Sequence, residues 1–322
     1  MDLMIRNVRL IDGTDAHTKS RVTVEISNGI INWVGDSSSR PRVRQHRHEI
    51  NGEGLTLMPG MIDCHEHFTG DGGPHVMESL LQDSRESFTL KAIGNCRRSL
   101  MSGVTSARDV GSRYGINIDI AKGTANGSIL GPMIIAAGEW FQFEGTWPAA
   151  LTRRTENIDA LRDAIVEQIS KGAGLIKVGA TGFGANGEQF GSLGLTALTV
   201  AVQTAHHAGL KIAAHCVGYE GSRQAVEAGI DSIEHGTYLD DYTVQLMAEK
   251  GTYFIPTMST WDARQRVASL VDVSKEQLIQ NEERKENSIA SFKRALSAGV
   301  KIATGTDSGG SFARHGYIYR EI

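Results

Sequence analysis

Short runs of alternating apolar and polar side chains fill the first part of the chain. These runs cover residues 3–11, 22–26 and 30–35. A period of two is typical of β-strands with one buried face. Asp12-Gly13 and Asn28-Gly29 border the runs, and both dipeptides tolerate the positive φ angles that tight turns need. We therefore expect residues 1–56 to form a small N-terminal β module, part of a β-sandwich.

From residue 57 onward, apolar strands alternate with helices. Ile158, Leu161, Ile165 and Ile169 have helical spacing, for example. A junction recurs in which a helical pattern ends in glycine and a short apolar run follows. Its glycines are Gly103, Gly172, Gly209, Gly229, Gly251 and Gly299. Glycine at this place supplies the left-handed residue that ends a helix.

Eight apolar runs in this region are predicted to be strands of one sheet. They cover residues 57–63, 104–109, 133–138, 174–178, 211–215, 231–235, 253–256 and 301–305. Alternating strands and helices imply parallel βαβ units, and eight units imply a closed (β/α)8 barrel of the TIM type, an α/β fold, over residues 57–322. A doubly wound open sheet is the alternative. It is disfavoured because no Gly-x-Gly-x-x-Gly follows the first strand.

Composition narrows the class of protein. The 322 residues carry a formal net charge of −4, which argues against binding to nucleic acid or to a membrane surface. No apolar run approaches the roughly 18 residues of a membrane span, and the first residues lack the pattern of a secretory signal. Three scattered cysteines, Cys64, Cys96 and Cys216, suit reduced thiols in a cytoplasm. We expect a cytoplasmic protein with a small-molecule substrate. The sequence is compatible with a homo-oligomer.

Two histidines mark the end of the first predicted barrel strand, in His65-Glu66-His67. Residues i and i+2 of a strand face the same side, so both imidazoles point in one direction. Paired neutral imidazoles suit Zn²⁺ or a similar metal. A solvated loop with histidines there by chance is the simpler interpretation, and it fits this pair less well.

Four further polar residues lie in or after other predicted strands: Lys177, His215, His235 and Asp307. Lysine is almost never buried without a partner, so Lys177 either extends to solvent or has a function; from its sequence position alone, extension to solvent is favoured. A protonated lysine repels a metal, whereas a neutral or chemically converted one can bind it. Because polar residues at the carboxyl ends of barrel strands converge, the six residues together indicate a metal site.

These motifs resemble the signature of the amidohydrolase superfamily. The matching segments are Pro59-Gly60-Met61-Ile62-Asp63-Cys64-His65-Glu66-His67, Ile176-Lys177, His215, Glu234-His235-Gly236 and Thr306-Asp307. Gly103-Val104-Thr105, Arg108-Asp109 and Leu175-Ile176-Lys177 resemble the imidazolonepropionase-related branch, which includes prolidase-like dipeptidases. The N-terminal β module resembles the accessory sandwich of that family.

The resemblance implies a ligand set for two divalent metal ions, with zinc as the expected metal. His65, His67 and Asp307 are implied to hold one ion, and His215 and His235 the other. Lys177 is implied to be carbamylated, with its new carboxylate bridging both ions.

The expected reaction is hydrolysis of an amide or peptide C–N bond by a hydroxide that bridges the two metals. Asp307 would act as general base and then as general acid. One alternative is another reaction on the same metals: hydrolysis of a lactone, phosphotriester, carbamate or urea, or a deamination. The other alternative is a non-catalytic truncated barrel. The intact ligand set disfavours the last of these.

Other predictions concern the substrate and the end of the chain. Tyr219, Arg314 and His315 are candidates to meet a substrate carboxylate, although an ordinary loop role is the simpler interpretation for each. The aromatic residues of segment 140–147 are expected either to wall the pocket or to pack on the barrel top. Since the chain stops soon after the eighth predicted strand, we expect a C-terminally truncated barrel without its last helix, with reduced stability or activity.

Overall fold

The computed structural model describes residues 2–14, 17–38, 48–143, 152–183, 189–267, 274–310 and 312–322. It divides into two compact units, Met1–Gly60 and Met61–Ile322. The boundary that we predict after residue 56, between the β module and the barrel, stays a prediction.

The first unit is a five-stranded sheet. Its strands are β1 (Asp2–Leu10), β2 (Lys19–Ser27), β3 (Ile30–Asp36), β4 (His48–Asn51) and β5 (Thr56–Leu57). β3, β2 and β1 pair antiparallel, while β4 and β5 run parallel to β1. The turn between β2 and β3 has φ angles of 54° at Asn28 and 79° at Gly29, which confirms the predicted hairpin turn.

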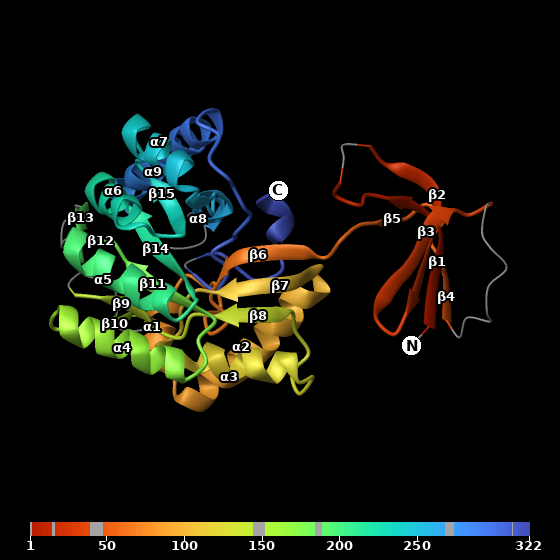
Figure 1. Ribbon diagram of the computed structural model, residues 1–322, viewed down its shortest axis with the longest axis horizontal. Helices are drawn as coiled ribbons and strands as arrows, with labels where there is room; N and C mark the ends of the chain where they lie inside the picture. Colours follow the sequence, from red (N-terminus) through yellow and green to blue (C-terminus); the bar gives the residue numbers. More distant parts are fainter. Residues whose placement is uncertain are drawn as a thin grey trace. The chain divides into compact units, whose positions relative to one another are not determined.

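The second unit begins with three parallel strands and their helices (Figure 1). Strands β6 (Met61–Glu66), β7 (Val104–Asp109) and β8 (Met133–Ala136) form one sheet in that order. The connecting helices are α1 (Val76–Gln82), α2 (Arg85–Met101) and α3 (Ile116–Ala125), with a 3-10 turn at Arg113–Gly115 before α3.

A six-stranded parallel sheet follows, in the order β10-β9-β11-β14-β15-β16. Its strands are β9 (Trp140–Gln142), β10 (Thr152–Arg154), β11 (Leu175–Gly179), β14 (Lys211–Val217), β15 (Ser232–Thr237) and β16 (Tyr253–Ile255). The helices of this part are α4 (Ile158–Ser170), α5 (Gly194–His207), α6 (Tyr219–Ala228), α7 (Asp241–Lys250), α8 (Ser259–Val267) and α9 (Lys275–Ser297). A small hairpin, β12 (Thr181–Phe183) with β13 (Gln189–Gly191), and a 3-10 turn at Ile318–Arg320 complete the described elements.

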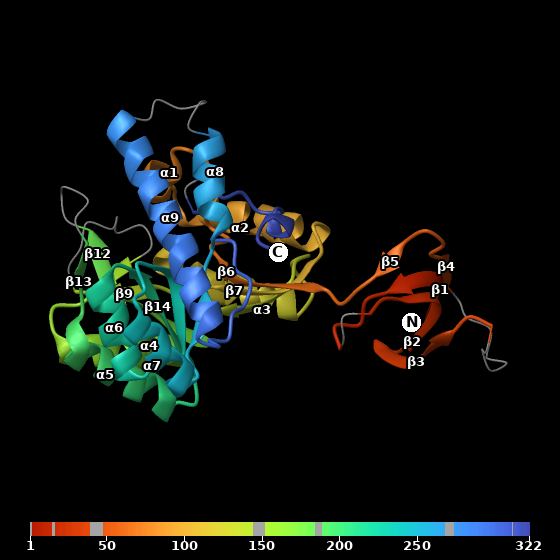
Figure 2. The same ribbon diagram turned by 90° about the horizontal axis from the view of Figure 1, so that it is seen from above.

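Backbone hydrogen bonds connect the two parallel sheets. The N–H of Gly174, just before β11, donates to the carbonyl of Ala136 on β8 at 2.9 Å. Segment 301–308 receives a hydrogen bond from Phe254 of β16 and forms a β-bridge from Ser308 to Glu66 of β6. Figure 2 gives the view from above, in which β6, β7, β9 and β14 are labelled. The unit has a TIM-barrel-like α/β fold, and these links are those expected of the predicted closed ring.

The predicted helix ends are confirmed by the backbone. All six junction glycines have positive φ, from 72° to 99°. Side chains cap several helix starts: Asn157 accepts from the N–H of Ala160 at 2.9 Å, and Ser274 forms a capping box with Gln277. Among the helices that the structure describes, none is both long and apolar enough to cross a membrane.

Three predicted elements differ from the structure. Residues 301–305 form no regular strand, because the Thr306 N–H bonds the Asp63 carboxylate and the chain turns through Asp307 at φ 55°; only Ile302 makes a β-bridge there. The strand predicted over residues 57–63 begins at Met61, after Pro59, which has no N–H to donate. Residues 140–142, which lie outside the eight predicted strands, form β9 and bury their side chains.

Candidate metal centre

The six predicted ligands lie at neighbouring strand ends in the second unit. His65 and His67 are at the end of β6, Lys177 is on β11, and His215 and His235 are on β14 and β15. Asp307 follows the bridge from Ile302 to β16. Parallel strands present their carboxyl ends to one side, which brings residues distant in sequence to one place.

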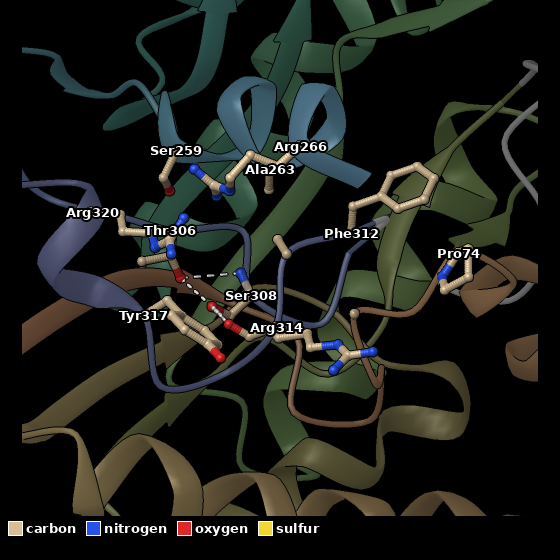
Figure 3. Close-up of a pocket in the computed structure, with 12 residues that line it drawn as sticks. Pro74, Ser259, Ala263, Arg266, Thr306, Ser308, Phe312, Arg314, Tyr317 and Arg320 are labelled. Carbon is tan, nitrogen blue, oxygen red and sulfur yellow. Dashed lines mark hydrogen bonds between the residues drawn. The ribbon is translucent and has the colours of Figure 1, made fainter. Parts of the chain in front are cut away.

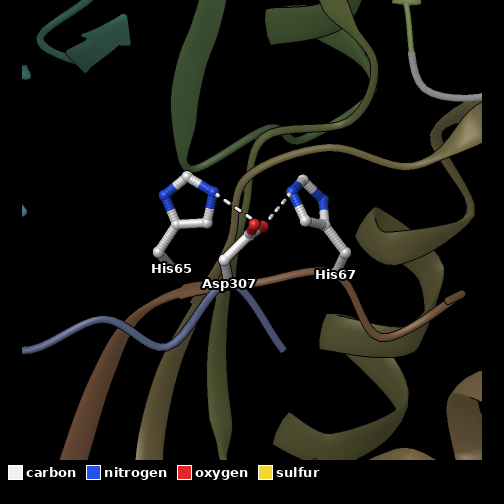
Figure 4. A group of neighbouring side chains, drawn as sticks. All are labelled: His65, His67 and Asp307. Carbon is white, nitrogen blue, oxygen red and sulfur yellow. Dashed lines mark ion pairs between the residues drawn. The ribbon is translucent and has the colours of Figure 1, made fainter. Parts of the chain in front are cut away.

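His65, His67 and Asp307 form the tightest group (Figure 4). The Nε2 atoms of His65 and His67 each lie 3.5 Å from Oδ1 of Asp307. One ligand atom from each of the three residues lies within 4.8 Å of the others, as a shared metal ion requires.

Hydrogen bonds on the far side of each ring decide which nitrogen carries the proton. Nδ1 of His67 lies 2.8 Å from the carbonyl oxygen of Gly111, which can only accept, so Nδ1 donates. Nδ1 of His65 lies 2.6 Å from Oε2 of Glu234, a carboxylate that also pairs with Arg108. Each histidine therefore presents a lone pair on Nε2 toward Asp307.

His215 and His235 continue this group. The His235 ring centroid lies 4.7 Å from that of His65 and 4.6 Å from that of His215. Nδ1 of His235 lies 2.7 Å from the Thr257 hydroxyl. His235 has φ 69°, a left-handed conformation that is strained for a residue with a Cβ and that places its ring against the other two.

Lys177 is fully buried and does not extend to solvent. Its Nζ has no hydrogen-bond partner among the residues that the structure describes, and it lies 5.5 Å from the centre of the Trp140 ring. Burial lowers the pKa of Lys177 to about 8. Burying an amine without a hydrogen-bond acceptor costs free energy of folding. We therefore expect Lys177 to have a chemical role.

The electrostatics favour neutral imidazoles. Burial first, then the positive charge of Lys177, holds the pKa of His65 and of His215 well below the usual range. Burial lowers the pKa of His67 to about 4. Burial also raises the pKa of Asp307 to about 7, against the opposing effect of the Arg264 guanidinium.

These features fit a divalent metal. Neutral imidazole nitrogens and a carboxylate are the donors that zinc and similar ions prefer. Nε2 of His65 is buried and has no hydrogen-bond partner in the described part of the chain. A proton on Asp307 could satisfy only one of the two imidazole lone pairs that face it, whereas a cation satisfies all three groups.

The other predicted residues lie elsewhere or have structural partners. Both ring nitrogens of His315 are bonded, Nδ1 to Glu66 and Nε2 to the Gly70 carbonyl, so His315 is a buried structural residue. Tyr219 is exposed at the start of α6. Trp140 lies against the centre, 5.3 Å from the His215 ring; Trp147 and its neighbours lie outside the described residues.

A pocket of about 280 Å³ lies beside segment 301–308 (Figure 3). Thr306 and Ser308 line it, as do Arg314, Tyr317 and Arg320, but none of the six candidate ligands does. The pocket therefore adjoins the turn that carries Asp307, but the candidate ligands do not line it.

Sequence reasoning assigned no role to four residues around the centre. Asp63 accepts hydrogen bonds from the backbone and hydroxyl of Thr306 and so fixes the turn that carries Asp307. Arg108 and Glu234 pair inside the strands, and Arg264 on α8 acts electrostatically on Asp307. Arg108 and Glu234 carry opposite charges within the apolar runs 104–109 and 231–235. Because charged residues are seldom buried unless they are paired, these charges could have indicated a buried ion pair.

The TIM-barrel-like α/β fold carries a candidate metal site in which His65, His67 and Asp307 come together. The sequence model of the amidohydrolase family matches residues 56–320. The chain therefore belongs to the amidohydrolase family and is a hydrolase that acts on carbon–nitrogen bonds.

Individual relatives support the same placement. The ochratoxinase of Aspergillus niger is 28% identical over 332 residues, which covers 93% of this chain and 67% of that protein. The crystal structure of a Xaa-Pro dipeptidase with bound methionine in its active site has a TM-score of 0.86 and 26% identity, and it covers 100% of this chain and 82% of that one. The crystal structure of A. niger ochratoxinase has a TM-score of 0.81 and 27% identity, with 98% and 77% covered. The resemblance predicted from the motifs is confirmed.

Proposed function

We propose that this chain is a two-metal hydrolase that cleaves the amide bond of a small substrate with a free carboxylate, such as a dipeptide or an N-acyl amino acid. The observation that carries the proposal is the convergence of His65 Nε2 and His67 Nε2 on Asp307 Oδ1, each at 3.5 Å. The similar Xaa-Pro dipeptidase holds methionine, an amino acid with a free carboxylate, in its active site.

His65, His67 and Asp307 would hold one ion, and His215 and His235 the second. Zinc is the metal we expect, because the donors are imidazole nitrogens and carboxylate oxygens. Lys177 would serve both ions as a carbamate. In that reaction the neutral amine of Lys177 forms an N–C bond to CO₂ and releases one proton, which leaves an anionic carboxylate. Burial lowers the pKa of Lys177 to about 8, so a neutral amine is accessible near neutral pH.

Two divalent ions, when bound, supply a nucleophilic water near neutral pH and polarise the carbonyl of the substrate. Asp307 would take the proton of the attacking water on a carboxylate oxygen and deliver it to the leaving nitrogen. A pKa of about 7 suits a group that must both accept and donate a proton. The Trp140 ring, buried beside His215, would exclude solvent from one side of the substrate.

A substrate panel tests the proposed function. Purified protein loaded with Zn²⁺ or Mn²⁺ should release amine from dipeptides or N-acyl amino acids, and a chelator should abolish this release until metal is restored. Release from lactones or phosphotriesters alone would contradict the proposal.

Arg264 is the candidate for contact with the substrate carboxylate. Its guanidinium lies 4.9 Å from the centre of the Trp261 ring. Its Nε is buried with no hydrogen-bond partner there, and its charge lowers the pKa of Asp307 against the effect of burial. A guanidinium beside the reacting groups suits a substrate carboxylate.

Replacing Arg264 by Met should raise KM for an N-acyl amino acid about 10- to 100-fold, because a hydrogen bond to a charged group is lost. The carboxamide analogue of the same substrate should show little change in KM. Arg266→Met is the matched control, since Arg266 is on the same helix and pairs with Asp262. Equal effects on the acid and on its carboxamide would refute the role of Arg264.

A further inference from the structure

An ion pair lies where a TIM-type barrel ordinarily has branched aliphatic side chains. Arg108 is on β7, and Glu234 is on β15 of the other parallel sheet. Nη2 of Arg108 donates to Oε1 of Glu234 at 2.7 Å, and the Glu234 side chain is completely buried. Because a buried ion pair seldom stabilises a fold more than apolar side chains of similar size, this pair calls for another explanation.

Arg108 is fixed by two further contacts. Its Nε donates to the carbonyl oxygen of Cys64 at 2.7 Å, on the residue before His65. Its Nη1 donates to the Ser232 hydroxyl at 3.1 Å, and that hydroxyl donates to Oε1 of Glu234 at 2.6 Å. The guanidinium thus connects β6, β7 and β15 around one carboxylate.

The second oxygen of this carboxylate reaches a candidate metal ligand. Oε2 of Glu234 lies 2.6 Å from Nδ1 of His65. A carboxylate that is paired with an arginine only accepts, so the proton lies on Nδ1 and the lone pair on Nε2. Nε2 is the atom that faces Asp307 at 3.5 Å.

We propose that Arg108 and Glu234 are positioning residues that orient His65 and fix its proton on Nδ1, so that Nε2 binds a divalent metal ion. The inference rests on the proposed metal centre. Arg108 holds the Glu234 carboxylate in place, and Glu234 holds the imidazole. Neither residue belongs to the proposed ligand set. Outer contacts of this kind contribute about 10- to 100-fold to metal affinity in proteins.

The test is competition for Zn²⁺ between the full chain and a chromophoric chelator, without substrate. Glu234→Leu leaves a buried unpaired arginine and is expected to destabilise the fold. The informative variant is therefore the double replacement Arg108→Met with Glu234→Leu, which puts apolar groups of similar volume in place of both charges. The matched control is Arg153→Met with Glu167→Leu, which removes a partly exposed pair whose atoms lie 2.8 Å apart.

We expect the double variant to unfold at a temperature close to that of the wild type but to bind one zinc ion about 10- to 100-fold more weakly. The control should bind zinc as the wild type does. A double variant with both wild-type stability and wild-type zinc affinity would show that the pair is only structural, and would overturn the inference. Failure of the wild type itself to bind zinc would instead refute the proposed metal centre.

Discussion

Asp307→Asn is expected to lower kcat by about 100- to 10,000-fold, because an amide cannot accept the proton of the attacking water. Asparagine has nearly the same shape and still offers one oxygen, so most of the bound metal should remain. The backbone N–H of residue 307 donates a hydrogen bond to the His65 carbonyl oxygen at 2.8 Å, and the substitution does not change this bond. Turnover and metal content are measured on the same preparation.

Asp231→Asn is the matched control for this change. Asp231 precedes β15 at its amino end and pairs with Lys211 and His206, away from the carboxyl ends of the strands. It should keep wild-type turnover. If Asp307→Asn turned over as fast as the control, Asp307 would not be the proton-transfer group.

Lys177→Met is expected to reduce turnover by at least about 100-fold, since the shared anionic ligand of the two ions is lost. Methionine has a similar length and suits a buried position, so the fold should persist. For Lys177→Ala, the cavity left by the side chain should accept a short carboxylic acid such as acetate or propionate, and this acid should restore part of the activity.

Isotopically labelled bicarbonate gives an independent measurement on the wild type. A carbamate carbon signal should appear in its NMR spectrum and be absent from that of Lys177→Met. Wild-type turnover in Lys177→Met, or a wild-type spectrum without this signal, would contradict the carbamate. The exposed Lys211→Met variant serves as the control, because Lys211 is at the other end of the strand that carries His215.

Much of the fold is predictable because it depends on local rules. The glycine that ends a helix and the apolar run that follows it place five of the predicted barrel strands within a few residues, and the apolar runs alone place β6 and β8. The eighth is different: residues 301–308 follow non-local contacts, and the Asp63 carboxylate draws Thr306 out of a regular strand. No pattern within residues 301–308 shows that contact.

The candidate site likewise has features that local sequence predicts and features that depend on non-local contacts. His65 and His67 share a direction because they are two residues apart on one strand, which sequence alone indicates. The burial of Lys177 could not be read from its position, since a lysine in an apolar strand often extends to solvent. The contacts from Arg108 to Glu234 and on to His65 join three strands that are far apart in sequence, so only the folded chain shows them.

The central claim is that the six side chains together bind two divalent ions, and counting the ions tests it most directly. Metal content per chain should be measured after equilibrium dialysis against Zn²⁺ with bicarbonate present, for the wild type and for Lys177→Met. Two tightly bound ions per wild-type chain, and fewer in the variant, are the predicted result. No tightly bound ion in the wild type, or an equal number in both proteins, would contradict it.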